Sequence, residues 1–357
     1  AAAKKIRWER ARLAAFGSTR HKSNRPGDDP NLNALLHAET PIVTIFGKSW
    51  TLHVDEVLET TRAENLAMIA ESVSYMTERG REAVYDAEHF FDGYEADSAY
   101  ALDTLRAARD AGASTLVLCD TNGGTLTGRM ATIVREAAAA LAADAGAATR
   151  PIIWGIHTHN DAELAVANAL AAVDAGVRHV QATINGYGER AGNANIVSLL
   201  ANLALKTPYT LDPLGGGDIA DLTALSRSVA EIANVNPNDY QPYVGRSAFA
   251  HKGGVHGAAV AKVERSYQHV DPVSVGNEGR LIHKWVHFLP IYERYFAPYA
   301  GKAPHFLEIG VSGGGSLEMW RRYFGPDATI FGMDIDPACA TCVDPPNQVR
   351  IGSQADP

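Results

Sequence analysis

Cysteine is scarce in this chain, which has three among 357 residues, too few for the disulfide framework of a small secreted protein. Long apolar runs are missing too, and none approaches the ~18 residues of a membrane-spanning helix. A basic excess is also lacking, because 32 Lys and Arg stand against 41 Asp and Glu, whereas a nucleic-acid-binding face needs positive charge. Charged residues interrupt residues 1–17, so no signal-peptide core is present. These absences predict a cytoplasmic protein without a membrane or nucleic-acid partner.

Short apolar runs alternate with amphipathic stretches along the first 206 residues. Six runs have the length and composition of buried strands: residues 13–16, 42–46, 83–87, 115–119, 152–156 and 179–184. Stretches with helical periodicity lie between them, at residues 64–79, 99–111, 127–143 and 162–175. This repeat, at ~30-residue spacing, predicts βα units and a parallel sheet.

Polar or charged residues follow nearly every one of these runs, among them Lys48, Glu88, Thr121 and His157. In a doubly wound sheet such residues would cluster at one switch point. Polar endings on all strands instead favour a TIM (β/α)8-type barrel, whose active site draws on every βα loop. A complete barrel has eight units and six are visible, so we predict an incomplete barrel that lacks its first two units.

Two histidines stand at the end of the fifth run, where residues 155–161 read Gly-Ile-His-Thr-His-Asn-Asp. On a strand, residues i and i+2 point to the same side, so His157 and His159 should face one place. A single His-x-His is more often structural than metal-binding. Here the next strand leads into a glycine-rich loop, residues 185–194, that carries Glu189, Arg190 and Asn193. The combination favours a divalent-metal site.

The pattern changes after residue 206. Residues 207–217 are rich in Pro and Gly, and residues 220–233 have helical periodicity. From residue 283 an aromatic-rich helix begins, followed by an apolar run, a glycine-rich turn and a second βα pattern. We therefore predict three parts: a partial barrel over 1–206, a helical subdomain over 207–281, and a Rossmann-like module over 283–357.

The motifs of residues 1–281 resemble those of the 2-isopropylmalate, homocitrate and citramalate synthase superfamily. The resemblance rests on residues 155–161, on Asn-Gly-Tyr-Gly-Glu-Arg-Ala-Gly-Asn-Ala at 185–194, and on Tyr-Asp-Ala-Glu-His-Phe-Phe-Asp-Gly-Tyr at 85–94. Residues 15–20 (Ala-Phe-Gly-Ser-Thr-Arg), 44–50 and 246–256 are similar to the citramalate branch. This resemblance implies condensation of acetyl-CoA with pyruvate, thioester hydrolysis, a role in branched-chain amino-acid synthesis, and a homodimer as the family's assembly.

The resemblance also assigns roles to single residues. It implies metal ligation of Mg²⁺, Mn²⁺ or Zn²⁺ by His157, His159 and Asn193, because these match the family's ligands. The remaining assignments are Glu88 and His256 as catalytic residues, and Thr121 and Arg190 as substrate-binding residues.

Each of these assignments has a simpler alternative. Glu88 could be a carboxylate that ends a strand in water, Thr121 an ordinary turn residue, and His256 a surface histidine. Arg190 could brace its own loop rather than contact the phosphates of CoA. His53, after the second run, could be no more than a helix-start residue.

One departure from the family's pattern is serious. The family's first strand ends in Asp-Thr-Thr-Leu-Arg-Asp-Gly, which supplies an aspartate ligand and a catalytic arginine, and no such motif occurs here. We therefore expect activity to be impaired or absent. The alternatives are condensation with a larger 2-oxo acid, as in 2-isopropylmalate synthesis, and a non-catalytic remnant. The chain starts at Ala1, and a natural fusion, a genomic rearrangement and a designed chain all remain open.

Residues 307–316, Leu-Glu-Ile-Gly-Val-Ser-Gly-Gly-Gly-Ser, follow an apolar run and precede a helix. Acidic residues end the next run, and this order is typical of a nucleotide-binding βαβ unit. The sequence of these residues resembles the start of a class I S-adenosylmethionine-dependent methyltransferase. That resemblance implies cofactor contacts at Glu308, Gly310 and Asp334 or Asp336, while a structural turn without a ligand is the alternative.

Overall fold

The computed structural model describes residues 6–9, 11–144, 151–209, 211, 218–249, 263, 266, 268–277, 289–311, 314–341, 343, 345–353 and 355. The chain divides into two compact units, residues 1–217 and 218–357. His256, the expected boundary near residue 281, and Ser312 and Gly313 of the glycine-rich turn lie outside the described residues. No helix within the described ranges is long and apolar enough to cross a membrane.

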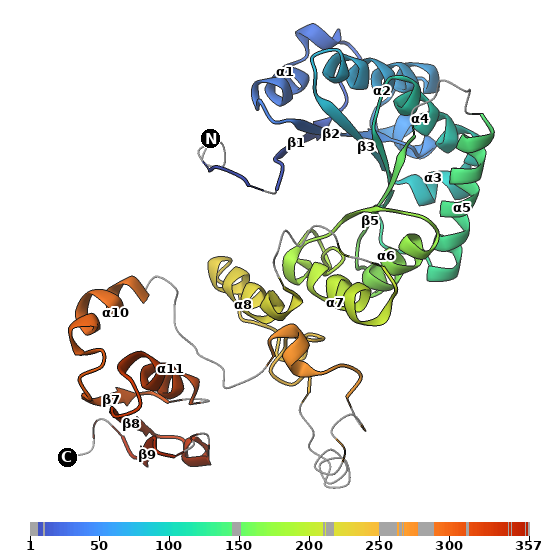
Figure 1. The fold of residues 1–357 in the computed structure, drawn as a ribbon. Helices are drawn as coiled ribbons and strands as arrows, with labels where there is room; N and C mark the ends of the chain where they lie inside the picture. Colours follow the sequence, from blue (N-terminus) through green and yellow to red (C-terminus); the bar gives the residue numbers. More distant parts are fainter. Residues whose placement is uncertain are drawn as a thin grey trace. The chain divides into compact units, whose positions relative to one another are not determined.

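The first unit is built on one parallel sheet whose six strands pair in sequence order (Figure 1). The strands are β1 (Ala14–Ser18), β2 (Ile42–Lys48), β3 (Glu82–Glu88), β4 (Thr115–Asp120), β5 (Ile153–Thr158) and β6 (His179–Gln181). The connecting helices are α1 (Pro30–His37), α2 (Arg62–Thr77), α3 (Phe90–Ala96), α4 (Ser98–Asp110), α5 (Thr127–Ala143) and α6 (Ala165–Asp174), and α7 (Ile196–Lys206) follows β6. The six predicted βα units are confirmed, although β6 ends at Gln181 because the chain turns at Ile184–Gly186.

Capping residues mark where two of these helices begin. Asp29 accepts hydrogen bonds from the backbone amides of Asn31 and Leu32, and Pro30 occupies the first turn of α1. The hydroxyl of Thr61 accepts from the amide of Glu64 at the start of α2. Each cap satisfies amides that the helix itself leaves unpaired, and such a cap typically contributes about 1 kcal/mol.

The two faces of this sheet differ because successive strand residues point to opposite sides. One face carries apolar side chains such as Tyr85, Leu116, Leu118 and Ile156, all fully buried in the core cluster with helix residues. Helices α2, α4 and α5 lie along this side in Figure 1. Burying a side chain of this size contributes roughly 1.5–3 kcal/mol, so this layer dominates the stability of the unit.

The opposite face is concave, as one long-range hydrogen bond demonstrates. Gln181 on β6 donates from Nε2 to Oδ1 of Asp86 on β3 at 2.9 Å, although β4 and β5 lie between these strands. In a flat sheet, three strand spacings would separate the two backbones by about 14 Å. The sheet therefore curves in the manner of a barrel wall, with its polar residues on the inner side.

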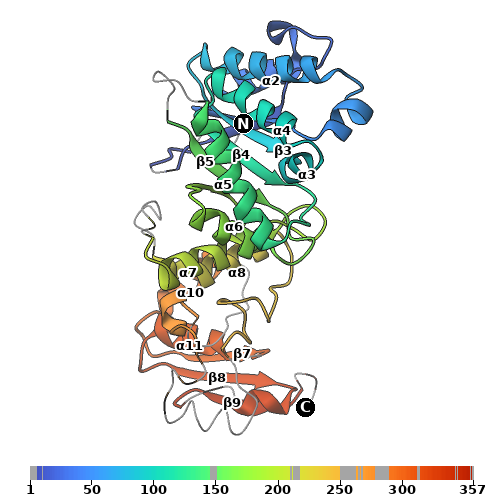
Figure 2. The ribbon, with the colours of Figure 1, turned by 90° about the vertical axis from the view of Figure 1, so that its right-hand side faces the viewer.

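The described elements of the second unit form two groups. Helix α8 (Leu222–Ile232) is tied to the short helix Pro272–Val275 by a hydrogen bond from Thr223 Oγ1 to the carbonyl oxygen of Val275, 2.6 Å long. Strands β7 (His305–Ile309), β8 (Thr329–Asp334) and β9 (Gln348–Ile351) form a parallel sheet in that order (Figure 2).

Helix α11 (Gly315–Phe324) connects β7 to β8, and α10 (Leu289–Phe296) precedes β7. Aromatic rings pack between these elements: Trp320 and Phe324 are almost fully buried, and the rings of Phe296 and Phe306 lie against both. The expected strand, helix and strand of this segment are therefore present, with a core of their own.

Candidate functional site

The inner face of the curved sheet carries two of the candidate side chains, Glu88 and His157. Lys48, Glu88 and Gln181 are the last residues of β2, β3 and β6, while His157 lies one residue before the end of β5. Backbone register places Lys48 opposite Glu88 and His157 opposite Gln181. Because all strands are parallel, these positions share the carboxyl-terminal edge, where barrel enzymes place their chemistry.

The two histidines face each other, as the i, i+2 spacing predicts. Their Nε2 atoms are 3.2 Å apart, and their ring centroids are 5.0 Å apart. Burial lowers the pKa of His157; burial, and then the nearby His157 and Arg190, lower that of His159. Both rings therefore favour the neutral form that metal ligation requires.

Asn193 lies beside this pair because its backbone forms an isolated antiparallel bridge with His159. Its Oδ1 atom is buried and has no hydrogen-bond partner, and the same is true of His159 Nδ1. Gly188 leaves room for the amide, since a Cβ at that position would come within 2.8 Å of the Asn193 oxygen. An orphaned amide oxygen on the residue that is bridged to His159, together with two neutral imidazoles, is a donor set that suits a divalent cation.

The distance between the histidines also fits a shared ion. Two nitrogens bound at ~2.1 Å and separated by 90–110° lie about 3.0–3.4 Å apart, and the observed separation is 3.2 Å. No group of three or more His, Cys, Asp or Glu side chains gathers as a metal site among the described residues. Among the described residues, the donors at this site thus include no carboxylate.

Glu88 is paired with Lys48, to which the sequence suggested no role beyond that of a polar strand end. Lys48 Nζ lies 2.5 Å from Glu88 Oε2, and both side chains are mostly buried. Lys48 ends the strand next to that of Glu88, and this position could have predicted the ion pair. The two strands are known to be neighbours only once the strand order is known.

The loop after β3 links Glu88 to Thr121. His89 adopts a left-handed conformation, φ 56°, and its backbone amide donates to Thr121 Oγ1 at 2.8 Å. The ring of His89 packs against His53, with centroids 4.1 Å apart. His53 begins a short π-helical turn, as its helix-start interpretation predicts, but its Nδ1 atom is buried without a hydrogen-bond partner.

Arg190 is engaged by its surroundings. Its guanidinium donates to both carboxylate oxygens of Asp161, at 2.8 and 3.0 Å, and to the carbonyl oxygen of Thr121 at 2.7 Å. These contacts connect the loop after β6 to the loops after β5 and β4. Arg190 thus makes the contacts of a residue that holds its own loop in place, which is one of the two roles considered for it. The other role is contact with the phosphates of CoA.

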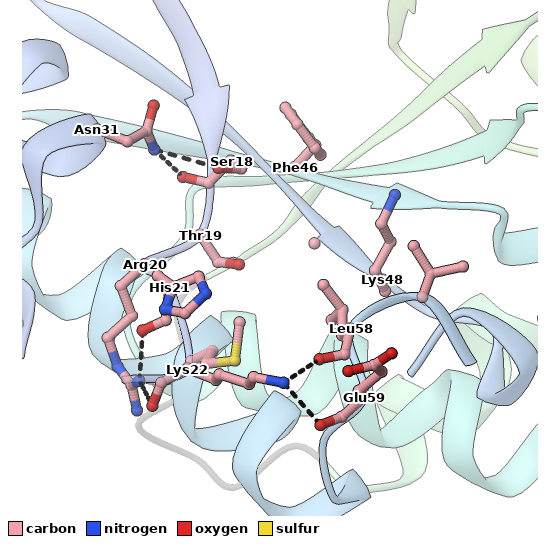
Figure 3. A pocket seen from close by; sticks show the side chains of 13 residues that line it. Ser18, Thr19, Arg20, His21, Lys22, Asn31, Phe46, Lys48, Leu58 and Glu59 are labelled. Atoms are coloured by element: carbon pink, nitrogen blue, oxygen red, sulfur yellow. Dashed lines mark hydrogen bonds between the residues drawn. The ribbon is translucent and has the colours of Figure 1, made fainter. Parts of the chain in front are cut away.

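A cavity of about 500 Å³ opens near the carboxyl-terminal ends of β1 and β2 (Figure 3). Its cationic side chains are already paired. Arg20 contacts Glu64 and Glu71 at 2.8 and 2.7 Å, and Lys22 Nζ donates to the carbonyl oxygens of Leu58 and Glu59. These contacts stabilise the loops around the cavity, a function that sequence reasoning did not assign to Arg20 or Lys22.

In the second unit, the expected cofactor residues lie at the ends of β7 and β8. Glu308 accepts a hydrogen bond from Ser316 Oγ at 2.6 Å. Gly310 has φ 86°, which suits glycine. Asp334 Oδ2 accepts from the amide of Val311 at 2.7 Å, and Asp334 Oδ1 accepts from the amide of Asp336 at 3.0 Å. The carboxylate of Asp334 thus joins the ends of both strands.

Comparison with known proteins identifies the family. Residues 24–229, more than half of the chain, match the HMGL-like family. The chain belongs to that family. A hydroxymethylglutaryl-CoA lyase structure from Pseudomonas aeruginosa superposes with a TM-score of 0.53 at 15% identity, covering 73% of this chain and 78% of that one. This likeness supports an α/β fold of the TIM-barrel type.

Two relatives are similar in sequence over most of the chain. An (R)-citramalate synthase of Synechocystis is 51% identical over 274 residues, which cover 77% of this chain and 50% of that protein. An (R)-citramalate synthase of Streptomyces coelicolor is 43% identical over 324 residues, covering 90% and 56%. The second alignment reaches beyond residue 281, into the part assigned above to another module. The chain spans about half the length of these curated relatives.

Proposed function

We propose that the inner face of the sheet is the site of a metal-dependent condensation of acetyl-CoA with pyruvate. The observation that supports this most directly is the approach of His157 and His159 to 3.2 Å, beside the orphaned oxygen of Asn193. Several relatives at 43–51% identity are named (R)-citramalate synthase. A site with two imidazoles and an amide oxygen suits the metal-dependent condensation proposed here.

Each residue has a part in the reaction. His157, His159 and Asn193 would hold Mg²⁺, Mn²⁺ or Zn²⁺, which supplies Lewis acidity to the ketone of the 2-oxo acid. Glu88 would remove a proton from the methyl group of acetyl-CoA, and the resulting enolate attacks the ketone carbon of the 2-oxo acid. The electron pair of the C=O π bond moves to oxygen, and the alkoxide takes up the proton that Glu88 had accepted. Water then hydrolyses the thioester and releases CoA.

The surrounding groups orient these reactants. Thr121 can donate its hydroxyl proton to the carboxylate of the 2-oxo acid while it accepts from the His89 amide. Lys48 orients the Glu88 carboxylate. Arg190 holds the Asn193 loop in place through Asp161. His256, expected to act near the thioester, remains a prediction because it lies outside the described residues.

Calorimetry tests this function independently of turnover. Pyruvate should bind the chain only when Mn²⁺ or Mg²⁺ is present, and a larger branched 2-oxo acid should bind more weakly. Stronger binding of the larger acid would favour the 2-isopropylmalate-type reaction. Absence of metal-dependent binding of either acid would favour a non-catalytic remnant. His157→Ala provides the control, since it removes a proposed ligand.

We further propose that the β7–α11–β8 segment derives from the nucleotide-binding start of an S-adenosylmethionine-dependent methyltransferase. Two features support this: the positive φ of Gly310 at the turn, and the acidic residues Glu308, Asp334 and Asp336 at the strand ends. Calorimetric titration with S-adenosylmethionine tests the idea. The same titration of Asp336→Asn should show weaker binding, whereas no binding by the parent chain would contradict the proposal.

A further inference from the structure

A chain of hydrogen bonds crosses the inner face of the sheet below the histidine pair. Asp86 on β3 accepts from Nε2 of Gln181 on β6 at 2.9 Å. Oε1 of the same glutamine lies 2.8 Å from Nδ1 of His157 on β5. Asp86 is almost completely buried, 3% exposed, so this network is shielded from solvent. Neither Asp86 nor Gln181 stood out in the sequence.

The chemistry of these groups fixes the direction of each hydrogen bond. Gln181 Nε2 donates to Asp86 Oδ1, and this oxygen can accept whether the carboxyl is ionised or carries its proton on Oδ2, so the NH₂ group of Gln181 faces Asp86. The amide oxygen of Gln181 then faces His157, and because it only accepts, Nδ1 of His157 must carry the proton. A neutral imidazole has one N–H, which leaves a lone pair on Nε2. That lone pair points toward His159, 3.2 Å away.

We propose that Gln181, held by Asp86, is a positioning residue that fixes the tautomer and the ring orientation of His157. This role rests on the proposed function, because a metal ion at the histidine pair needs the Nε2 lone pair that this network supplies. The partner of a ligating histidine orients the ring and raises its basicity, and its loss commonly weakens metal binding 10–100-fold. The network thus extends across the inner face from Asp86 on β3 through Gln181 on β6, and it orients one proposed metal ligand, His157 on β5.

Three variants of the full chain separate this role from a general effect on packing. Gln181→Met keeps the shape of the side chain but removes both hydrogen bonds. Gln181→Glu keeps an acceptor for His157, and Asp86→Asn keeps an acceptor for Gln181. Calorimetric titration with Mn²⁺ and Zn²⁺ should show affinity lowered about 10–100-fold in Gln181→Met and within about threefold of the parent chain in Asp86→Asn.

The second readout is the tautomer of His157, observed by ¹⁵N NMR in the metal-free chain and assigned by comparison with His157→Gln. The parent chain, Gln181→Glu and Asp86→Asn should carry the proton on Nδ1, and Gln181→Met should lose this preference. Unchanged tautomer and unchanged affinity in Gln181→Met would overturn the proposal. If the parent chain binds no metal, the proposed function fails, whereas the tautomer measurement still supports or overturns the role of Gln181.

If Gln181→Met does not fold, Gln181→Leu replaces it, because leucine also removes both hydrogen bonds. Retention of the Nδ1–H tautomer in Gln181→Leu would likewise contradict the proposal.

Discussion

Lys48 and Glu88 form an ion pair of 2.5 Å across neighbouring strands, with 17% and 22% of their side chains exposed. Their backbones are directly opposite in the register of β2 and β3, so the pairing follows from the sheet itself rather than from a mobile loop. The carboxylate proposed to remove a proton is therefore oriented by a rigid element, and a general base needs this precision of placement.

Replacing Lys48 by Met should destabilise the first unit. The substitution leaves the mostly buried Glu88 carboxylate without its ionic partner, and such a loss costs about 1–3 kcal/mol. Lys48→Arg is the matched control, because it keeps the positive charge and a donor. Urea unfolding at pH 7 measures the difference, and equal stability of the two variants would show that the ion pair contributes nothing.

Asp86 should make the stability of the protein depend on pH. Burial raises the pKa of this carboxyl from 3.8 to about 7, Gln181 lowers it, and Glu88 raises it. The folded state thus binds a proton that the unfolded state releases, and stability should fall as pH rises from about 4 to about 7 and then level off. A shift of this size corresponds to on the order of 4 kcal/mol.

Asp86→Asn isolates this contribution, because asparagine does not ionise and keeps an acceptor for Gln181. The gain in stability from the substitution should be larger at pH 8 than at pH 5, as measured by urea unfolding at both values. A gain that is the same at both values would mean that Asp86 does not titrate in this range.

The histidine pair should be required for metal binding. Because His157 and His159 approach within 3.2 Å, removing either imidazole leaves one nitrogen and the amide oxygen of Asn193, too few donors for a stable site. His157→Ala and His159→Ala should therefore abolish calorimetrically detectable Mn²⁺ and Zn²⁺ binding. His305→Ala removes an imidazole from β7 in the other unit and should bind like the parent chain; a loss there would point to a different site.

The sequence was sufficient to predict the six strands and four of the helices of the first unit, because its apolar runs and amphipathic stretches alternate regularly, but the short helices α1 and α3 and the helix α7 were not predicted. The facing histidines were predictable for a similar reason, since two residues on one strand need no knowledge of the fold. Gln181 and Lys48 were not predictable. Their partners lie 95 and 40 positions away on other strands, and nothing local distinguishes either residue from an ordinary strand end.

Arg190 should control the mobility of its loop. Its fork of donors holds Asp161 and the Thr121 carbonyl together, and lysine cannot reproduce that bidentate geometry. Arg190→Lys should therefore increase hydrogen–deuterium exchange of residues 186–194, and Arg190→Ala should increase it further. If hydrogen–deuterium exchange is unaltered in Arg190→Ala, the result would favour the alternative role for Arg190, which is contact with a phosphate of CoA.

The purified 357-residue chain should form no detectable citramalate from pyruvate and acetyl-CoA. The described residues offer the metal two imidazoles and an amide, and none of their carboxylates joins this set. A carboxylate would neutralise charge on the ion, and losing one electrostatic contribution of this kind commonly costs ~10²–10³ in rate. Within the described sheet, β1 and β6 are also edges rather than neighbours, so the described strands do not close into a barrel. Thiol release from acetyl-CoA, measured with and without pyruvate in the presence of Mg²⁺ or Mn²⁺, decides the matter. Pyruvate-dependent release that disappears in Glu88→Gln would contradict this prediction, and would mean that a carboxylate from elsewhere in the chain or from a second copy completes the site.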